Sequence, residues 1–412
     1  MPAKMKRILI VAVGDPSLST AQQDALRPLI PSMKAAVGGL AAGTYVAKFD
    51  YAVAALGPGP NNQDLQDAIK KRLAEQKPDV ILTIASAATT AARDVARNDP
   101  RAIGIPIVFT VVSEPEHEPH GDPFITPGTP RAERITGVSR GLVQSAREAV
   151  SRFKQIIDPN QRLHVHWIHR QGLHQSDRAH DRITNPLLPI THTQLHPRTS
   201  DCSGMVDEVK RMRNPSPQGE ITALFLIPDD LVGSCAGPMI KTAHDPERKV
   251  PTLVQQLEWV CRKSNDPVGP PALAGYGVMP EWVGTKAGRC VHQVILNPDA
   301  AKTLPVLTPS EEDREFLINL GVAHTLGVPL AHPLPAWAKP CPVHAQPPAA
   351  PTKPKAARPT AAKASAKKPA RRAGGRKATP ARRARTKKRP AKAAKKGVAR
   401  KGRSTARRSK KR

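Results

Sequence analysis

The sequence predicts an α/β protein with two lobes on parallel β-sheets, followed by a basic tail. Three observations carry this prediction. Strand and helix patterns alternate along residues 1–335, which is typical of parallel sheets with helices on both faces. A body of about 330 residues is large for one hydrophobic core and natural for two. The last sixty residues hold 27 of the 64 Lys and Arg and no Asp or Glu.

The first half of the body alternates strands and helices. A continuous apolar run at Arg7–Val13 is typical of a strand buried on both faces. Leu65, Ile69 and Leu73 recur every four residues and predict one apolar helix face, with Asn62 as the N-cap. The other predicted elements are strands at Tyr45–Val53, Val80–Ile84 and Pro106–Val112 and a helix at Thr89–Arg97.

The second half opens with a strand at Ile135–Ser139, after a loop at Glu114–Arg134 that is rich in Pro, Gly and His. No clear pattern is visible between residues 170 and 215. The predicted strands are Leu163–Ile168, Ile221–Ile227 and Ala272–Tyr276, and the predicted helices are Val143–Ile157, Leu231–Ala243, Glu281–Leu296 and Asn319–Leu326.

The positive charge is concentrated at the C-terminus. Residues 339–412 carry 28 basic and no acidic groups, which leaves the rest of the chain with 36 basic and 34 acidic residues. Segment 353–412 has too few large apolar side chains to offset the entropy of ordering, so we expect it to be disordered in the free protein. A Pro-rich linker at 336–352 precedes it.

In composition the tail resembles the tails of linker histones and bacterial histone-like proteins. Dense Lys and Arg displace counterions from a polyphosphate, which predicts salt-sensitive nucleic-acid binding with weak sequence preference. Anionic membrane, acidic protein or a purely solubilising role are the alternatives. The predicted nucleic-acid contacts are Arg371, Arg372, Arg382, Arg383, Lys387, Lys388, Arg389, Lys395, Lys396, Arg407 and Arg408.

Five cysteines without Cys-x-x-Cys spacing argue against a disulfide framework or a thiolate zinc site, so we expect reduced thiols. The apolar run Ile8–Val13 is shorter than a signal-peptide core, and no stretch is long enough to span a bilayer. The expected location is the cytoplasm, with the periplasm as the alternative if the start site is misassigned.

Ligand-binding residues are expected where parallel strands end, because the amides of the following helix point outward there. Each candidate also has a plain structural explanation, as a helix cap or a solvated turn. The small hydroxyl and acidic residues at these strand ends are Ser86, Thr89, Ser113, Glu114, Asp229 and Asp230.

No enzyme signature is present. The chain lacks a Gly-x-Ser-x-Gly elbow, a P-loop and a Gly-x-Gly-x-x-Gly fingerprint. His164 and His166 point to one face of a strand, but no spacing supports a catalytic metal, and satisfied or surface histidines are favoured. We therefore predict neither a metal site nor a cofactor.

Five segments, in order over about residues 5–332, resemble motifs of ABC transporter substrate-binding proteins, in the branch with tryptophan- and tyrosine-binding members. They are Pro78–Ala88, Ile105–Pro115, Arg134–Ser139, Ala272–Gly277 and Ile318–Pro329. The chain departs from the family's motifs in three places. Ala85-Ser86-Ala87 replaces Gly-Thr-Pro, Glu114 replaces Asp, and Arg134 replaces Asn.

The resemblance implies a periplasmic binding protein-like fold, in which two Rossmann-like lobes joined by a hinge clamp a small ligand. It implies lobe 1 at 1–137 with 273–335 and lobe 2 at 138–272. It also implies that Ser86 with neighbouring amides holds a carboxylate, that Asp229 holds an ammonium, and that Tyr276 lines the wall or hinge. Cleft positions by resemblance are Ser86, Ala88, Ser113, Asp229 and Tyr276.

The predicted function is thus to bind a small carboxylate-bearing solute, such as an amino acid, with a tail that binds nucleic acid. An ABC permease is an expected partner if the protein is exported. The alternative is a nucleoid-associated, histone-like DNA-binding protein whose body is a ligandless scaffold.

Overall fold

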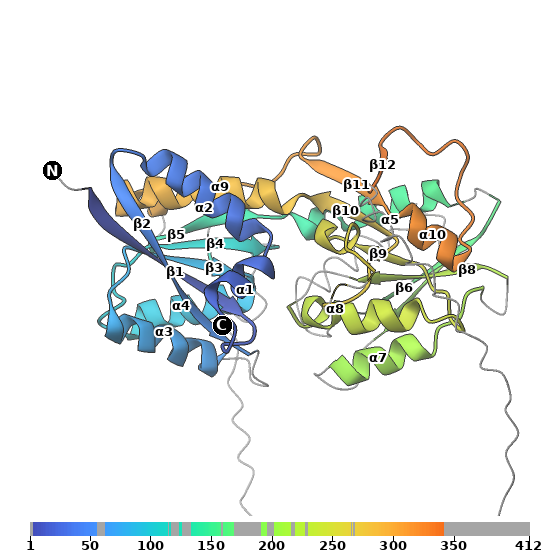
Figure 1. Cartoon of the computed structure of the whole chain (residues 1–412), viewed down its shortest axis with the longest axis horizontal. Helices are drawn as coiled ribbons and strands as arrows, with labels where there is room; N and C mark the ends of the chain where they lie inside the picture. Colours follow the sequence, from blue (N-terminus) through green and yellow to red (C-terminus); the bar gives the residue numbers. More distant parts are fainter. Residues whose placement is uncertain are drawn as a thin grey trace, which may run out of the picture. The chain divides into compact units, whose positions relative to one another are not determined.

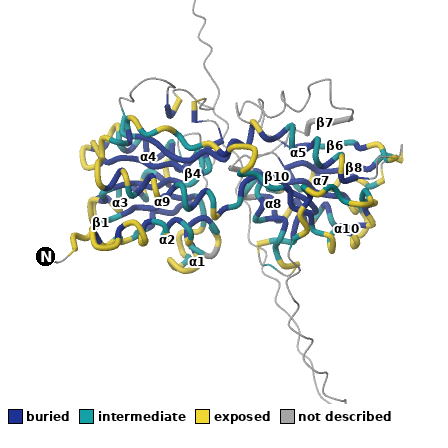
Figure 2. The backbone as a smooth tube through the Cα atoms, turned by 90° about the horizontal axis from the view of Figure 1, so that it is seen from above, coloured by how far each residue is buried: buried dark blue, intermediate teal, exposed yellow. Residues whose placement is uncertain are grey.

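The computed structural model describes residues 3–55, 62–113, 115–116, 123–125, 133–157, 160–168, 191–195, 202–215, 219–226, 230–264, 266 and 268–341. Within them the chain forms two β-sheets with helices on both faces of each (Figure 1). The central strands are largely buried, and the helices expose their outer faces (Figure 2). This confirms the predicted α/β class.

The first sheet has the strand order β2-β1-β3-β4-β5, and all of its pairs are parallel. The alternating apolar side chains of β1 supply both faces, since Ile8 and Ile10 face one core while Leu9 and Val11 face the other. The strands are β1 Lys4–Val13, β2 Tyr45–Ala54, β3 Val80–Ile84, β4 Ile107–Val112 and β5 Ile135–Ser139.

Helices cover both faces of this sheet, as the buried-both-faces pattern of β1 requires. Helices α2 (Leu29–Ala41) and α9 (Pro280–Leu296) pack on one face, and α3 (Gln63–Glu75) and α4 (Ser86–Asn98) pack on the other. A short helix, α1 (Thr20–Ala25), follows β1 and is capped by the Ser19 side chain.

The second sheet has the order β12-β11-β10-β9-β8-β6-β7, and only the β10–β11 pair is antiparallel. Helix α5 (Leu142–Ile156) and α10 (Leu320–Leu326) cover one face, and α7 (Cys202–Lys210) and α8 (Asp230–Ala243) cover the other. The strands are β6 Leu163–Ile168, β7 Thr191–Leu195, β8 Ile221–Leu226, β9 Thr252–Val254, β10 Ala274–Val278, β11 Arg314–Ile318 and β12 Ala338–Pro340.

The boundary between the lobes differs from the predicted one. The sequence boundaries place 273–335 in lobe 1, but β10, β11 and α10 belong to the second sheet. Helix α9, the 3-10 turn η2 (Pro298–Lys302) and the segment up to Leu307, which bridges to Val138 of β5, return to the first sheet. Strand β5 belongs wholly to the first sheet, so the first crossover follows Ser139. Strand alternation predicts elements but not the sheet that each one joins.

Local details also differ from expectation. Asn62 does not cap α3 through its side chain; its amide instead donates to the Ala87 carbonyl at 3.4 Å. Elements β7 and α7 lie in the region where the sequence shows no clear pattern. The predicted linker contains β12, and its residues from 342 onward lie outside the described part, as does the whole tail.

The cysteines correct the expectation of reduced thiols. Cys202 is bonded to Cys235, and Cys261 to Cys341, while Cys290 is a buried free thiol. Elements far apart in sequence bring each pair to Cα separations of 5.2 and 5.4 Å, within the range that a disulfide needs. An odd cysteine count excludes complete pairing but not two bonds with one thiol left over.

Burial of a histidine makes stability pH-dependent. Desolvation lowers the pKa of His244, beside Thr252 at 3.0 Å, to about 4. An unfolded histidine takes up its proton near pH 6.5, so the unfolded chain binds more protons between pH 6.5 and 4. We expect stability to fall as pH falls through this window. Melting temperatures from pH 7 to 4.5 should decline less in His244→Gln than in the wild type. The exposed control His324→Gln should follow the wild type; an equal decline in all three would contradict the prediction.

Candidate functional site

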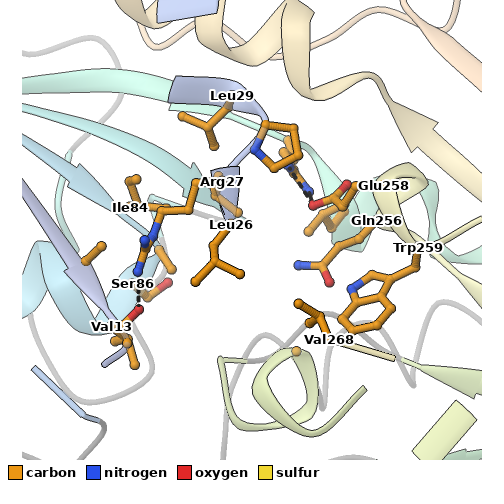
Figure 3. A pocket seen from close by; sticks show the side chains of 18 of the residues that line it. Val13, Leu26, Arg27, Leu29, Ile84, Ser86, Gln256, Glu258, Trp259 and Val268 are labelled. Carbon is orange, nitrogen blue, oxygen red and sulfur yellow. Dashed lines mark hydrogen bonds and ion pairs between the residues drawn. The ribbon is translucent and has the colours of Figure 1, made fainter. Parts of the chain in front are cut away.

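A cavity of about 380 Å³ lies where strands of the first sheet end, facing elements of the second sheet (Figure 3). Carboxyl ends of parallel strands are where α/β proteins bind ligands. One wall consists of Ala12, Val13, Gly14, Leu26, Arg27, Pro28, Leu29, Ile84, Ala85, Ser86, Val111 and Ser113. The other consists of Arg140, Leu142, Gly233, Gln256, Glu258, Trp259, Arg262 and Val268.

The N-terminus of α4 forms part of the first wall. Ser86 is its first residue, and the turn before it is held because Ala85 donates its N–H to the Thr110 carbonyl at 2.9 Å. Thr89 donates to the Ala85 carbonyl at 2.9 Å and lies 2.8 Å from the Thr83 hydroxyl. The dipole of a thirteen-residue helix favours a negative group at this end.

Backbone strain gathers at the same wall. Among the described residues, four that are not glycine have positive φ, and two of these, Ala85 (74°) and Val111 (63°), line the cavity. Val111 sits where the β4–β5 register shifts between Thr110 and Val112. A positive φ is a true outlier for a β-branched residue, and such strain concentrates at binding sites.

Arg27 brings a positive charge to the first wall. Its guanidinium donates to the Val13 carbonyl at 2.7 Å and to the Gln23 side chain at 2.5 Å, which fixes its position (Figure 3). A Cβ on Gly14 would lie 2.6 Å from this guanidinium, so the glycine leaves it room. Burial lowers the pKa of Arg27, while Tyr51 and Asp24 oppose that shift. An arginine side chain stays protonated in proteins, so Arg27 contributes a positive charge to this wall.

The second wall contains an ion pair between a buried arginine and a partly exposed glutamate. Arg140, 2% exposed, donates through both Nη1 and Nη2 to Oε1 of Glu258 at 3.3 Å. Arg140 Nε and Glu258 Oε2 are buried and have no hydrogen-bond partner among the described residues. Buried polar atoms are almost always paired with protein, water or a bound group, so these two atoms mark places where such a partner is needed.

Trp259 and Arg262 complete this wall. The Arg262 guanidinium lies 3.8 Å from the Trp259 ring centroid, a close cation–π contact, and donates from Nε to the Glu258 carbonyl at 3.2 Å. Burial lowers the pKa of Arg262, while Asp266 and Glu258 oppose that shift. The stacked pair makes a flat, partly cationic surface.

Hydrogen bonds hold the two walls in register. The Ser139 hydroxyl donates to the Ser113 carbonyl at 3.1 Å and accepts from the Gly141 N–H at 3.0 Å, on either side of Arg140. The Gln255 amide donates to the Leu142 carbonyl at 2.7 Å. The crossover that carries Arg140 is thereby bound to the strand end that carries Ser113.

The predicted site residues fall into three groups. Ser86 and Ser113 line the cavity, whereas Glu114 and Asp229 lie outside the described residues. The other three, Ala88, Thr89 and Tyr276, are buried and do not line the cavity.

Local packing explains why these three side chains lie outside the cavity. Ala88 and Thr89 lie one turn inside α4, on its sheet-facing side. The Tyr276 ring lies in the second-lobe core, where Arg152 sits over it at 5.0 Å.

Sequence reasoning missed the charged residues of the site. Arg27 lies in a loop without a motif, and Arg140 and Glu258 are 118 residues apart, so nothing local links them. The strand-end rule could have found two of the segments. Arg140 directly follows β5, and Gln256–Trp259 follows β9, a three-residue strand that is too short to stand out.

No group of three metal-ligating side chains occurs within the described part of the chain. The rings of His164 and His166 on β6 have centroids 4.4 Å apart. Burial, together with the nearby His164, lowers the pKa of His166 to about 4.

No described helix is long and apolar enough to cross a membrane.

The chain has the fold of ABC transporter solute-binding proteins, the periplasmic binding protein type I fold. A conserved domain protein from Vibrio cholerae O1 biovar El Tor matches with a TM-score of 0.59 at 19% identity, over 82% of this chain and 99% of that one. An ABC domain from Streptococcus pneumoniae, in complex with L-Trp, matches at 0.58 and 16% identity, over 81% and 99%.

A ligand-free, open substrate-binding protein with adhesive properties, from Clostridium difficile, matches with a TM-score of 0.51 at 18% identity, over 81% of this chain and 98% of that one. At these identities the likeness establishes the fold alone. No protein-family model matches the sequence, and no curated protein matches it significantly.

Proposed function

We propose that the body binds a small solute carrying both a carboxylate and a hydrogen-bond donor such as an ammonium, as an amino acid does. The observation that carries this proposal is the Arg140–Glu258 pair, which leaves one buried donor and one buried acceptor unpartnered at the cavity. A carboxylate oxygen can accept from Arg140, and an ammonium can donate to Glu258.

The charge of the cavity supports an anionic group in the ligand. The described lining residues include three guanidinium groups, those of Arg27, Arg140 and Arg262, and one carboxylate, that of Glu258. The N-terminus of α4, with Ser86, adds a second place that favours a carboxylate. A cavity of about 380 Å³ with apolar and aromatic surfaces suits a ligand of amino-acid size.

The test is a thermal-shift screen of the twenty L-amino acids on the full chain. A ligand at a hundred times its Kd should raise the free energy of unfolding by about 2.7 kcal/mol. Arg140→Met combined with Glu258→Leu should remove that stabilisation, whereas Ser151→Ala, on α5 away from the cavity, should preserve it. A full shift in the double variant would mean that the ligand lies elsewhere.

An ABC permease is the proposed partner, with the lobes closing on the solute before delivery. The two disulfides favour an oxidising compartment over the reducing cytoplasm. We therefore propose that the functional protein resides outside the cytoplasm. Alkylating the free thiols of protein taken from separated cell fractions would show in which fraction the two disulfides are formed.

For the tail we propose non-specific binding to nucleic acid, which rests on its composition: 27 basic and no acidic residues in 353–412. Each neutralised phosphate of duplex DNA should make the slope of log affinity against log salt more negative by about 0.9. Anionic lipid surfaces share the chemistry, so vesicles with and without an anionic lipid belong in the same titration.

Truncation after Gln346 tests the tail. This boundary follows the compact unit Met1–Gln346 and keeps Cys341, which an earlier cut would remove from its disulfide. We expect the truncated protein to lose its salt-sensitive DNA binding and to keep the melting temperature of the full chain. Tight DNA binding by residues 1–346 would instead favour the alternative, a DNA-binding body without a ligand.

A further inference from the structure

We infer that the two disulfides position the second wall of the cavity, so that the chain binds solute fully only when both are oxidised. The inference rests on the proposed function for its binding consequence, and on the described contacts for the positioning itself. Both bonds lie in the lobe of the second sheet, and each is anchored beside residues that line the cavity.

The Cys261–Cys341 bond anchors the segment that carries the charged wall. Cys261 directly precedes Arg262 and follows the 3-10 turn η1 (Leu257–Trp259), which contains Glu258. Such turns are short and have poor hydrogen-bond geometry. The bond fastens this one to the end of β12, where the Cys341 N–H donates to the Ile318 carbonyl at 2.8 Å.

Besides the disulfide, buried side chains hold this segment, since Leu257, Trp259 and Val260 lie in the second-lobe core and Glu258 pairs with Arg140. Among the described residues, the Asn319 side chain donates to the Val260 carbonyl at 2.9 Å, and the Ala272 N–H donates to the Trp259 carbonyl at 2.8 Å. Opening the disulfide leaves the turn attached by these and by side-chain packing. We expect Glu258 to lose its fixed distance from Arg140, which belongs to another element.

The Cys202–Cys235 bond anchors α8 to α7 close to the cavity. Cys235 lies two residues after Gly233, which lines the cavity. Pro238 lies inside α8 and cannot donate the hydrogen bond that residue 238 would give to residue 234, so this part of the helix is intrinsically weak. The disulfide holds α8 at that weak point.

The two anchored elements also touch. A Cβ on Gly237 would lie 2.1 Å from the Val268 carbonyl oxygen, so α8 packs directly on the backbone of a lining residue. Gly269 in turn lies against the Trp259 ring. Movement of α8 therefore displaces the same wall that the other disulfide holds.

The first wall provides an internal control. Among the described residues it carries no disulfide. Cys290 on α9 is a buried free thiol, and burial raises its pKa to about 11.

Oxidation removes two electrons and two protons from each thiol pair, and a disulfide-type oxidant accepts them by exchange. Dithiothreitol reverses this, becoming a cyclic disulfide while each protein bond yields two thiols.

The first test counts thiols and follows hydrogen exchange in the full chain. Denatured, unreduced protein should take up one iodoacetamide label, at Cys290, and five after reduction. In Cys261→Ser with Cys341→Ser, amides of 257–262 should exchange about tenfold faster or more, while those of α4 stay unchanged. Five labels without reduction, or unchanged exchange at 257–262, would overturn the inference.

The second test adds binding. An equimolar mixture of the twenty L-amino acids should stabilise the oxidised protein and Cys290→Ala, and stabilise each disulfide-free double variant less. Equal stabilisation in all of them would overturn the inference. If exchange quickens locally but the mixture stabilises none of the proteins, the positioning role is supported and the proposed amino-acid ligand is what fails.

Discussion

Glu258→Ala should lower the free energy of unfolding by about 3 kcal/mol, because breaking a buried pair leaves the other charge uncompensated. The stranded group is the Arg140 guanidinium, which is 2% exposed and has its Nε already unpartnered. Urea unfolding of the wild type and the variant measures this loss. The same variant should lose the stabilisation by solute, since the acceptor proposed for the ligand is gone.

A paired substitution separates stability from binding. Arg140→Met with Glu258→Leu removes both charges and keeps similar volume, and such replacements are often neutral for stability. We expect unfolding in the double variant to approach the wild type while binding stays lost. If the double variant regains binding along with stability, the ion pair supports the fold and does not contact the solute.

Much of the fold follows from local patterns in the sequence. The run at Ile8–Val13 and the β-branched residues of 107–112 are continuous apolar stretches, and both are central strands of the first sheet. The spacing of Leu65, Ile69 and Leu73 gave the buried face of α3, as all three lie in one core. The spacing of apolar residues along a helix or strand decides which face is buried, so these elements were predictable from residues close together in the chain.

The site was less predictable because its parts meet only in the folded chain. The strand-end rule for parallel sheets is local, and it predicts Ser86 and Ser113, which line the cavity. The Arg140–Glu258 contact and the Cys261–Cys341 bond join residues 118 and 80 positions apart, and no periodicity encodes such pairs. The site depends on which sheet each strand joins, and sheet membership is also where the structure and the predicted lobe boundaries differ.

The crossover helix shows how packing outside the cavity sets its shape. Helix α9 leaves the second sheet after β10 and packs on α2, whose first residue, Leu29, lines the cavity. Gly284 and Gly288 lie one turn apart on α9 and allow the close approach. A Cβ on Gly284 would lie 2.2 Å from the Leu29 carbonyl, and one on Gly288 would lie 2.6 Å from the Ala36 Cβ.

Gly284→Ala should therefore destabilise the protein by about 2–3 kcal/mol, because the clash is with backbone and the helices must separate. The matched control is Gly39→Ala on α2, where nothing lies within 4 Å of the added Cβ. There the loss of unfolded-state entropy should raise stability by about 0.4–1 kcal/mol. The same chemical change on two packed helices should thus have opposite signs in urea unfolding.

Ligand binding gives a second comparison of the Gly284→Ala and Gly39→Ala variants. Moving α2 shifts Leu29 and, through the preceding loop, Arg27, so Gly284→Ala should also weaken stabilisation by the amino-acid mixture. Gly39 lies near the far end of α2, and its variant should bind as the wild type does. Normal binding by Gly284→Ala despite a large loss of stability would mean that the first wall is set by its own sheet and not by the crossover helix.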